Sequence, residues 1–383
     1  MKRYRVILLL KVLVAVLLLV ACNGRTEKET DSDVLIIDYN NAKEITFDKF
    51  FDFSKTEIIQ FEHNDSIFLS ERLEFNFADS YIFVLDIDAT QLYRFDMQGK
   101  LINKIGTSGS GPAEYNNVSF FQVNKSTKTI DILCDAGTTI KTFEYNGNYI
   151  KHFNTPFPTQ SFAQLNSNLY FFYSGFHGSD SHKRLHLCDT TDVINSYLYL
   201  KTNATDVTEQ NFTSYGTHGL FRESFFPSIY RYDSLGIEKI IRFNFGNCDV
   251  TENLKECDDL YQFFEDINNR GFCTTKDPAH QGKKITYIKT MYQIDMEASF
   301  SHFYINMEDS TYKKVISNEK DKILHDLFYQ LRMIHIDSND NGYYLINPYA
   351  FDNAVNEKPD MFPKKLEFAV NGNPLILILP LKL

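Results

Sequence analysis

The sequence has no tryptophan, few prolines and a deficit of positive charge. Among its 383 residues, 39 lysines and arginines stand against 50 aspartates and glutamates, which gives a formal net charge of −11. Proteins that bind nucleic acid gather lysine and arginine on one face, so this balance argues against a nucleic-acid partner. Because tryptophan is absent, 34 phenylalanines and 23 tyrosines supply all of the aromatic content.

Cysteine is also scarce. Six are present and no two form a C-x-x-C pair, so neither a zinc knuckle nor a dense disulfide framework is indicated. A pairing of Cys248 or Cys257 with Cys273 stays open, because an exported protein can form disulfides. Spacing alone does not decide it, since a disulfide needs a specific distance and orientation of the two residues.

Recognisable catalytic motifs are missing as well. No Ser-His-Asp order, nucleophile elbow or H-E-x-x-H pattern occurs. The glycine-rich stretch that ends at Gly111 is no phosphate-binding loop, because Pro112 follows where such a loop needs a lysine and then serine or threonine. These absences assign no reaction and favour a protein that is not an enzyme.

The first 21 residues have the pattern of a bacterial lipoprotein signal peptide. A cationic start precedes an apolar run over residues 6–20, which only Lys11 interrupts, and Leu19-Val20-Ala21-Cys22 resembles a lipobox. A membrane-spanning helix needs about 20 apolar residues, more than this run offers. We therefore expect cleavage before Cys22, lipid on its thiol as the membrane anchor, and a polar flexible tether over 22–40.

The rest of the chain has the composition and spacing of β structure. Phe, Tyr, Ile and Val, which pack well on pleated sheets, recur in runs of four to six residues bounded by turn residues. Two units repeat with an offset of 48 to 49 residues: Ile82–Asp86 with Phe95–Ile102, and Asp131–Asp135 with Phe143–Ile150. A period of 40 to 50 residues made of short strands and tight turns is typical of propeller blades.

Four further units can be marked out by strand-like runs, which makes six in all. They begin near residues 168, 228, 292 and 342. The sequence therefore predicts an all-β, six-bladed propeller over residues 41–383. The early run Glu57-Ile58-Ile59 is expected to complete the last blade, because a ring closed by its own terminus leaves no open sheet edge.

One segment breaks the β pattern. Between residues 251 and 268, Leu260, Phe263, Phe264 and Ile267 follow the spacing of one helix face, and charged residues fill the positions between them. We expect a helical insertion here. Its apolar stripe either packs on the rim of the propeller or serves as a lid or docking surface.

The connector Ile105–Tyr115 carries a family resemblance. Its sequence, I-G-T-S-G-S-G-P-A-E-Y, is similar to the I-G-x-x-G-x-G-P-x-E-Y connector of the six-bladed β-propeller lipoproteins of gram-negative anaerobes, relatives of the NHL-like and TolB-like propellers. The lipobox and the F-D-x-x-G-K turn at Phe95–Lys100 fit the same family. The resemblance implies the propeller fold, a place in the cell envelope and partner binding, without an agreed reaction.

Three carboxylates are candidate binding residues: Asp86, Glu114 and Asp135. If the repeats are blades, Asp86 and Asp135 occupy equivalent strand ends, where ring-related oxygens could bind Ca²⁺ near a central channel. The alternative is that an aspartate after a strand caps a turn with its side chain. His177, His182 and His186 also lie close together in the sequence, but a metal site needs further rigidly held ligands.

Two functions follow from these patterns. The first is a membrane-anchored envelope lipoprotein whose propeller acts as a scaffold and binds a protein or a glycan. The alternative is a Ca²⁺-dependent hydrolase or lactonase of the propeller type; apart from that ion, no cofactor is expected. The lipid on Cys22 implies attachment to the outer membrane, on its periplasmic face or at the cell surface.

Overall fold

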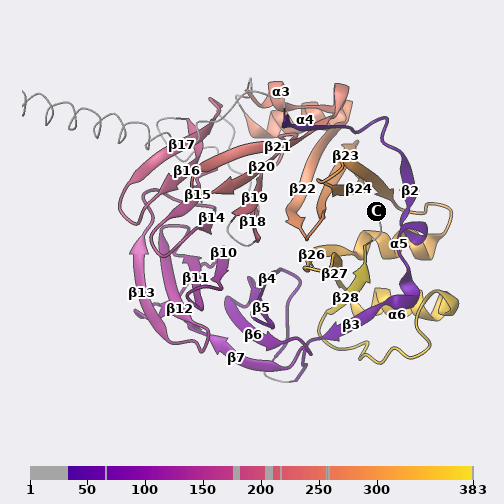
Figure 1. Ribbon diagram of the computed structural model, residues 1–383, viewed down its shortest axis with the longest axis horizontal. Coiled ribbons are helices and arrows are strands. Elements are labelled where there is room, and N and C mark those ends of the chain that lie inside the picture. Colours follow the sequence, from indigo (N-terminus) through magenta and orange to yellow (C-terminus); the bar gives the residue numbers. More distant parts are fainter. Residues whose placement is uncertain are drawn as a thin grey trace, which may run out of the picture.

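The protein folds as a ring of six β-sheets around a central axis (Figure 1). The computed structural model describes residues 33–381 except 65–66, 176–181, 203–209, 216–217, 256 and 258. The predicted signal peptide, Cys22 and the greater part of the predicted tether lie outside these residues. Each sheet is a blade of four antiparallel strands, and two blades carry a fifth strand. The prediction of an all-β, six-bladed propeller is confirmed.

The chain builds the blades in order from the axis outward. The first blade is β4 (Leu73–Ala78), β5 (Tyr81–Asp86), β6 (Gln91–Asp96) and β7 (Leu101–Ile105). The second is β10 (Phe120–Asn124), β11 (Thr129–Cys134), β12 (Thr139–Glu144) and β13 (Tyr149–Asn154). The third is β14 (Ser161–Gln164), β15 (Tyr170–Tyr173), β16 (Lys183–Cys188) and β17 (Val193–Tyr199).

The later blades follow the same plan. The fourth is β18 (Phe212–Tyr215), β19 (His218–Arg222), β20 (Ser228–Asp233) and β21 (Gly236–Asn244). The fifth is β22 (Phe272–Gln281), β23 (Ile285–Ile294), β24 (Glu297–Asn306) and β25 (Thr311–Ile316). The sixth is β26 (Arg332–Ile336), β27 (Asn341–Ile346), β28 (Leu375–Pro380) and β3 (Glu57–Gln60).

Burial explains why the second strands read as continuous apolar runs. Both faces of a blade pack against neighbouring blades, so β5, β11 and β15 are almost wholly buried. The outermost strands β7 and β13 have one face in solvent and mix exposed with partly buried positions. The apolar clusters of the core accordingly lie between successive blades.

The ring closes as the sequence predicts. Strand β3 pairs antiparallel with β28, so that Ile59 lies opposite Ile376 and Ile58 opposite Leu377. The sixth blade thus takes its outermost strand from the N-terminal part of the chain. This closure ties the two ends of the propeller together.

The N-terminal segment adds two strands that the sequence analysis did not predict. Strands β1 (Leu35–Asp38) and β2 (Glu44–Thr46) pair parallel with β21 and β25, on the outer edges of blades four and five. Short helices α2 (Phe47–Phe50) and η2 (Phe53–Lys55) then lead to β3. The expected tether over 22–40 is therefore too long, because the propeller already begins at β1.

The turn between β6 and β7 needs a glycine at position 99, because the closing strand β3 lies close to it. Gly99 has φ +82°, and a Cβ there would lie 2.1 Å from the carbonyl oxygen of Gln60 in β3. We expect Gly99→Ala to lower the free energy of unfolding by about 2–4 kcal/mol, from backbone strain and overlap with the closing strand. Urea denaturation measures the loss.

The equivalent turn of blade two supplies a matched control. Gly147 has φ +94°, but a Cβ there would lie 2.8 Å from its nearest atom, the carbonyl oxygen of Lys104. Gly147→Ala should therefore cost less than Gly99→Ala. Equal losses would show that backbone strain alone matters and that the contact with β3 contributes nothing.

The predicted insertion is helical, with a break in the middle. Helices α3 (Thr251–Lys255) and α4 (Leu260–Arg270) replace the single expected helix, and Asp259 caps α4 by accepting a hydrogen bond from the Gln262 amide. Phe263 and Ile267 are buried against blades four and five, as expected for packing on the rim, whereas Phe264 is partly exposed.

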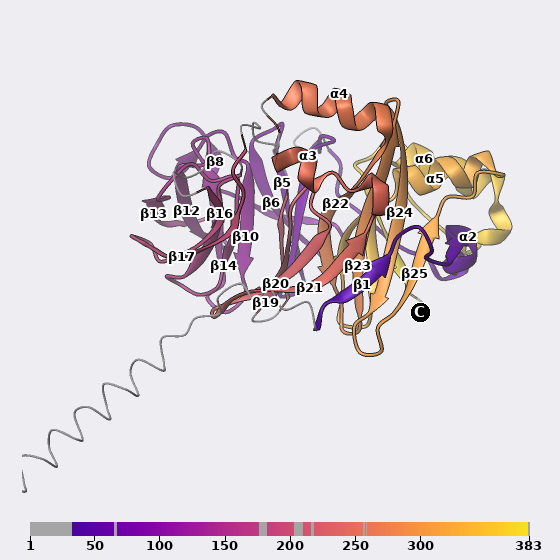
Figure 2. The same ribbon diagram turned by 90° about the horizontal axis from the view of Figure 1, so that it is seen from above.

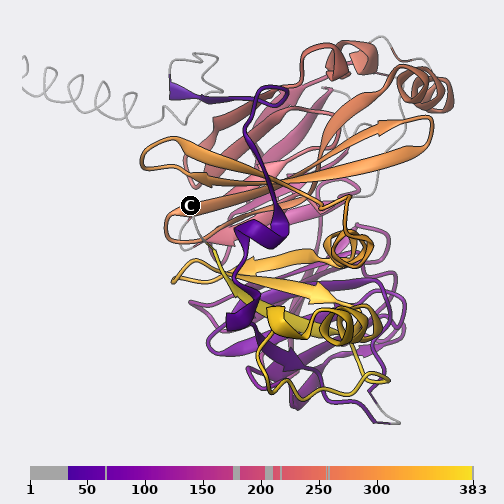
Figure 3. The same ribbon diagram turned by 90° about the vertical axis from the view of Figure 1, so that its right-hand side faces the viewer.

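The two ends of the ring differ. One end, which we call the helical face, carries α3, α4, α5 (Lys322–Gln330) and α6 (Pro348–Glu357) in the connections that enter the inner strands or join β27 to β28. Figures 2 and 3 show these helices gathered at one side. The other end, the turn face, carries the short hairpin turns. None of the helices in the part of the chain described is long and apolar enough to cross a membrane.

Candidate ligand-binding channel

The central channel is a recess that combines charged and aromatic side chains. The inner strands β4, β10, β18, β22 and β26 line two adjoining cavities along the axis. The cavity toward the helical face has a volume of about 270 Å³, and the one toward the turn face about 510 Å³. Phe75, Phe121, Phe212 and His280 line both. Such a recess, with apolar walls and a few polar groups, is where small ligands bind in most proteins.

A bulge in β22 places charge in this channel. The pairing of β22 with β23 shifts register between Lys276 and His280, and Asp277 within the bulge has φ +55°. Thr213 of blade four donates a hydrogen bond to the Ala279 carbonyl and fixes the bulge from the side. Bulges re-aim side chains and concentrate near functional sites, and a non-glycine residue at positive φ is strained. The strand is thus distorted where Asp277 meets the channel.

Asp277 is held as a carboxylate by surrounding cations. Lys289 Nζ lies 3.1 Å from Asp277 Oδ2. Burial acts to raise the pKa of Asp277, but the charges of Lys289, Arg222 and Arg332 outweigh it and lower that pKa to about 2. Asp277 therefore stays ionised at neutral pH and joins cations from blades four, five and six.

A second pair crosses the seam between blades six and one. Arg332, the first residue of β26, donates a hydrogen bond to the Leu73 carbonyl, and its Nη1 lies 3.9 Å from Glu74 Oε1. Burial raises the pKa of Glu74 to about 7, with Arg332 acting in the opposite direction. Glu74 can therefore gain or lose a proton near neutral pH.

The histidines of the channel are neutral. Burial lowers the pKa of His280 to about 4 and that of His335 to about 3. The His335 ring also stacks on Phe77, with ring centres 4.4 Å apart. No three His, Cys, Asp or Glu side chains within the described ranges come together in a way that could hold a metal ion.

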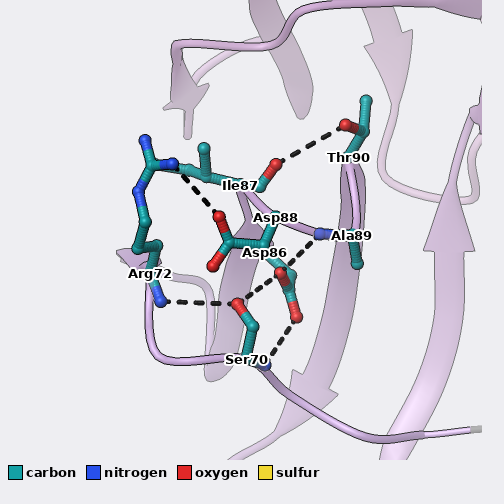
Figure 4. A network of polar contacts seen from close by, with 7 residues as sticks. All are labelled: Ser70, Arg72, Asp86, Ile87, Asp88, Ala89 and Thr90. Atoms are coloured by element: carbon teal, nitrogen blue, oxygen red, sulfur yellow. Dashed lines mark hydrogen bonds and ion pairs between the residues drawn. The ribbon is translucent and has the colours of Figure 1, made fainter.

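Of the predicted site residues, Asp86 is the last residue of β5 and lies between Ser70 and the turn at 87–90 (Figure 4). Its carboxylate accepts hydrogen bonds from the amide and hydroxyl of Ser70 and from the amide of Ala89, at 2.7–2.9 Å. Beside it, Arg72 forms an ion pair with Asp88 at 3.1 Å. The contacts of Asp86 are those of the turn-capping alternative.

Glu114 is used in a similar way. Its side chain accepts a hydrogen bond of 2.8 Å from the Gly111 amide, inside the glycine-rich connector. The ammonium of Lys141 donates to the backbone carbonyls of Glu114 and Gly111. The connector itself forms the small parallel pair β8 (Thr107–Ser108) and β9 (Glu114–Tyr115), which confirms its interpretation as an inter-blade turn.

The expected equivalence of Asp86 and Asp135 is wrong by one residue. In blade one Asp86 pairs with Gln91, and the same position of blade two is the Cys134–Thr139 pair. Asp135 lies beyond the strand at φ +54°. Among the described residues, Asp86, Glu114 and Asp135 belong to no group of three His, Cys, Asp or Glu side chains that could hold a metal ion.

The two described histidines of the predicted cluster have different surroundings. His186 is buried in β16 with Nδ1 2.8 Å from the Ser196 hydroxyl, and burial lowers its pKa to about 4. His182 precedes that strand and lies edge-on to Tyr199. His177 lies outside the described residues.

The described cysteines lie in or near the apolar core. The five cysteines that the structure describes form no disulfide. Burial raises the pKa of Cys273 above its ordinary value, and the Cys248 thiol acts in the same direction. Of the two possible partners left open by the sequence, Cys248 packs in the same apolar cluster as Cys273, whereas Cys257 belongs to a different cluster.

The channel residues were missed because they are far apart in the sequence. Glu74, Arg222, Asp277 and Arg332 come from four blades and share no local motif. One local signal was present: a proline inside an otherwise strand-like segment, as at Pro278, marks a bulge or an edge.

The fold and the channel define a six-bladed β-propeller with a polar axial recess. The profile described as "Domain of unknown function (DUF4934)" matches residues 32–380, so the chain belongs to that family. No curated protein sequence matches the chain.

Two crystal structures from Bacteroides are similar in fold. One is a protein described as exported, from Bacteroides fragilis NCTC 9343, with a TM-score of 0.71 and 15% identity over 91% of this chain and 99% of that one. The other is a member of the DUF4221 family from Bacteroides vulgatus ATCC 8482, with a TM-score of 0.51 and 11% identity over 86% of this chain and 99% of that one. At these identities the likeness concerns the fold alone.

Proposed function

We propose that this protein is an exported, lipid-anchored binding protein whose propeller holds an envelope protein or glycan at the channel and the helical face. The observation that carries the proposal is the channel itself, where a strained bulge brings charged side chains from several blades into one recess. Export is supported by the signal-like N-terminus and by the description of the Bacteroides fragilis neighbour. The kinship with NHL-like and TolB-like propellers, most of which bind partners, belongs to the same proposal.

The direction of β1 indicates how the propeller would be oriented relative to the membrane. Strand β1 is parallel to β21, which runs from the turn at Asp233–Gly236 toward α3, so the chain enters β1 at the turn face. Figure 2 shows this end of β1 on the side away from α4. A lipid on Cys22 would therefore hold the turn face nearer the membrane and leave the helical face free to meet a partner.

Site-specific photocrosslinking in the native envelope tests the binding role. A photoreactive residue at Lys276 in the channel, or at Tyr261 on α4, should give one defined adduct in amounts comparable to the protein. Tyr261 is well suited because its side chain is 81% exposed. The matched control is Leu235 in the turn of blade four, exposed by 58% on the opposite face.

Comparing the three photoreactive positions distinguishes the possible results. An adduct at Lys276 or Tyr261 without one at Leu235 supports the proposal and shows which part of the surface binds. Equal labelling at all three positions, or no adduct at any of them, contradicts it.

A further inference from the structure

The strongest unassigned feature is the cationic wall of the helical-face cavity. Arg222, Lys276 and Arg332 line it together with the carboxylates Glu74 and Asp277, and Asp277 already has Lys289 as its partner. The chain as a whole carries a formal charge of −11. In this recess cations outnumber carboxylates, although the protein as a whole is acidic. Its apolar walls concentrate the electric field of these cations, so the recess favours an anionic ligand.

Arg332 has further hydrogen-bond donors with which to bind such an anion. A guanidinium offers five N–H donors. Within the described structure, the Arg332 guanidinium makes a single hydrogen bond, to the Leu73 carbonyl. The Glu74 carboxylate lies 3.9 Å away, beyond hydrogen-bonding distance, and the Arg332 side chain is 33% exposed. The planar fork matches a carboxylate, which it binds through two parallel hydrogen bonds.

The opposite wall offers groups for the rest of the ligand. Gln210 donates to the Ser119 carbonyl, but its Oε1 accepts no hydrogen bond from any described residue, so it is a natural acceptor for a hydroxyl. Phe75, Phe121 and Phe212 provide apolar ring surface. A volume of about 270 Å³ suits one small unit rather than an extended chain.

We propose that the helical-face cavity binds an acidic sugar of the uronic-acid class, with its carboxylate on Arg332 and its hydroxyls toward Gln210. The proposal rests on the binding role given above and specifies its ligand class. The sugar is either free or the end of a longer acidic glycan.

Glu74 makes the binding dependent on pH. The groups that act on its carboxyl are Arg332 from β26, Asp277 from the β22 bulge and Arg72 from the loop before β4. A ligand carboxylate placed on Arg332 repels ionised Glu74, so binding favours the protonated form and takes up a proton. Affinity should accordingly rise as the pH falls from 8 to 6, where the uronate itself stays ionised.

Isothermal titration calorimetry on the full mature chain tests the proposal with D-glucuronate, D-glucose and acetate as probes. Glucuronate should bind at least tenfold more tightly than the other two. Arg332→Gln should weaken glucuronate at least tenfold, whereas Arg231→Gln, in the partly exposed pair with Glu238, should leave it unchanged. Glu74→Gln should keep the binding and flatten its dependence on pH.

Each outcome bears on the proposal. Tighter binding of a glucuronate-ended oligosaccharide than of the free sugar identifies a glycan end, and equal binding identifies the free acid; both support it. Glucuronate that binds no better than glucose, or Arg332→Gln that behaves like Arg231→Gln, overturns it. If a partner still crosslinks at Lys276 in that case, the binding role stands and only the ligand class is wrong.

Discussion

Replacing Cys22 by serine is expected to move nearly all of the protein from the membrane to the soluble fraction. Stable attachment needs two or more acyl chains, and the lipobox at Leu19–Cys22 makes Cys22 the residue that would carry them. Cell fractionation with a carbonate wash, together with metabolic labelling by a fatty acid, measures the change.

A second cysteine variant serves as the control. Cys248→Ser alters a partly buried thiol of the propeller and should leave both the lipid label and the membrane attachment intact. Retention of Cys22→Ser in washed membranes would contradict the lipoprotein assignment. In that case the orientation inferred from β1 would lose its basis as well, because it depends on where the chain is held.

A lipid anchor on Cys22 would also limit how far the propeller can reach from the membrane. Asp33, where the described chain begins, stands eleven positions after Cys22. Such a segment spans at most about 38 Å when fully extended, and about 18 Å on average if it behaves as a random coil. The propeller would therefore stay close to the membrane, with its turn face toward it.

The fold could be predicted because each blade is largely a local structure. Short apolar runs and glycine turns such as those at Gly99 and Gly147 fix strands and hairpins from neighbouring residues alone. The 48-residue repeat then gives the architecture. Even the closure by β3 follows from a general rule, because a ring left open would expose a sheet edge.

Two features could not be predicted, for different reasons. Strands β1 and β2 are three or four residues long and are held by parallel pairing with blades hundreds of residues away, so their own sequences carry little signal. Asp135 lies one residue beyond the position in blade two that corresponds to Asp86. A difference of one residue in strand register is visible only in the observed pairing of β11 with β12.

The candidate site was unpredictable for a related reason. A propeller brings together the inner strands of different blades, so the neighbours of Asp277 are set by the ring and not by adjacent residues. Charged residues at strand ends can equally well cap turns, and that is how Asp86 is used. Side-chain chemistry alone does not distinguish these roles, whereas burial and contacts do.

Breaking the buried ion pair between Arg184 and Glu223 is expected to destabilise the protein strongly. Arg184 Nε and Nη2 donate to the two Glu223 oxygens at 2.6 and 2.8 Å, with side chains 4% and 1% exposed. Burial alone would lower the pKa of Arg184, but Glu223 outweighs it and raises that pKa. Arg184 therefore stays charged whenever the protein is folded.

Glu223→Gln is expected to lower the free energy of unfolding by about 3–5 kcal/mol, because it leaves the Arg184 charge buried without a counterion. Urea denaturation followed by circular dichroism measures the loss. Glu238→Gln, in the partly exposed pair with Arg231, is the matched control and should cost less than about 1 kcal/mol.

A double variant separates the pair's net contribution from the cost of breaking it. Arg184→Met with Glu223→Leu removes both charges and keeps apolar volume, so it should recover most of the stability that Glu223→Gln loses. Arg184 lies in β16 of blade three and Glu223 just after β19 of blade four, which makes the pair a test of how two blades are joined. A Glu223→Gln loss no greater than that of Glu238→Gln would show that apolar packing alone joins them.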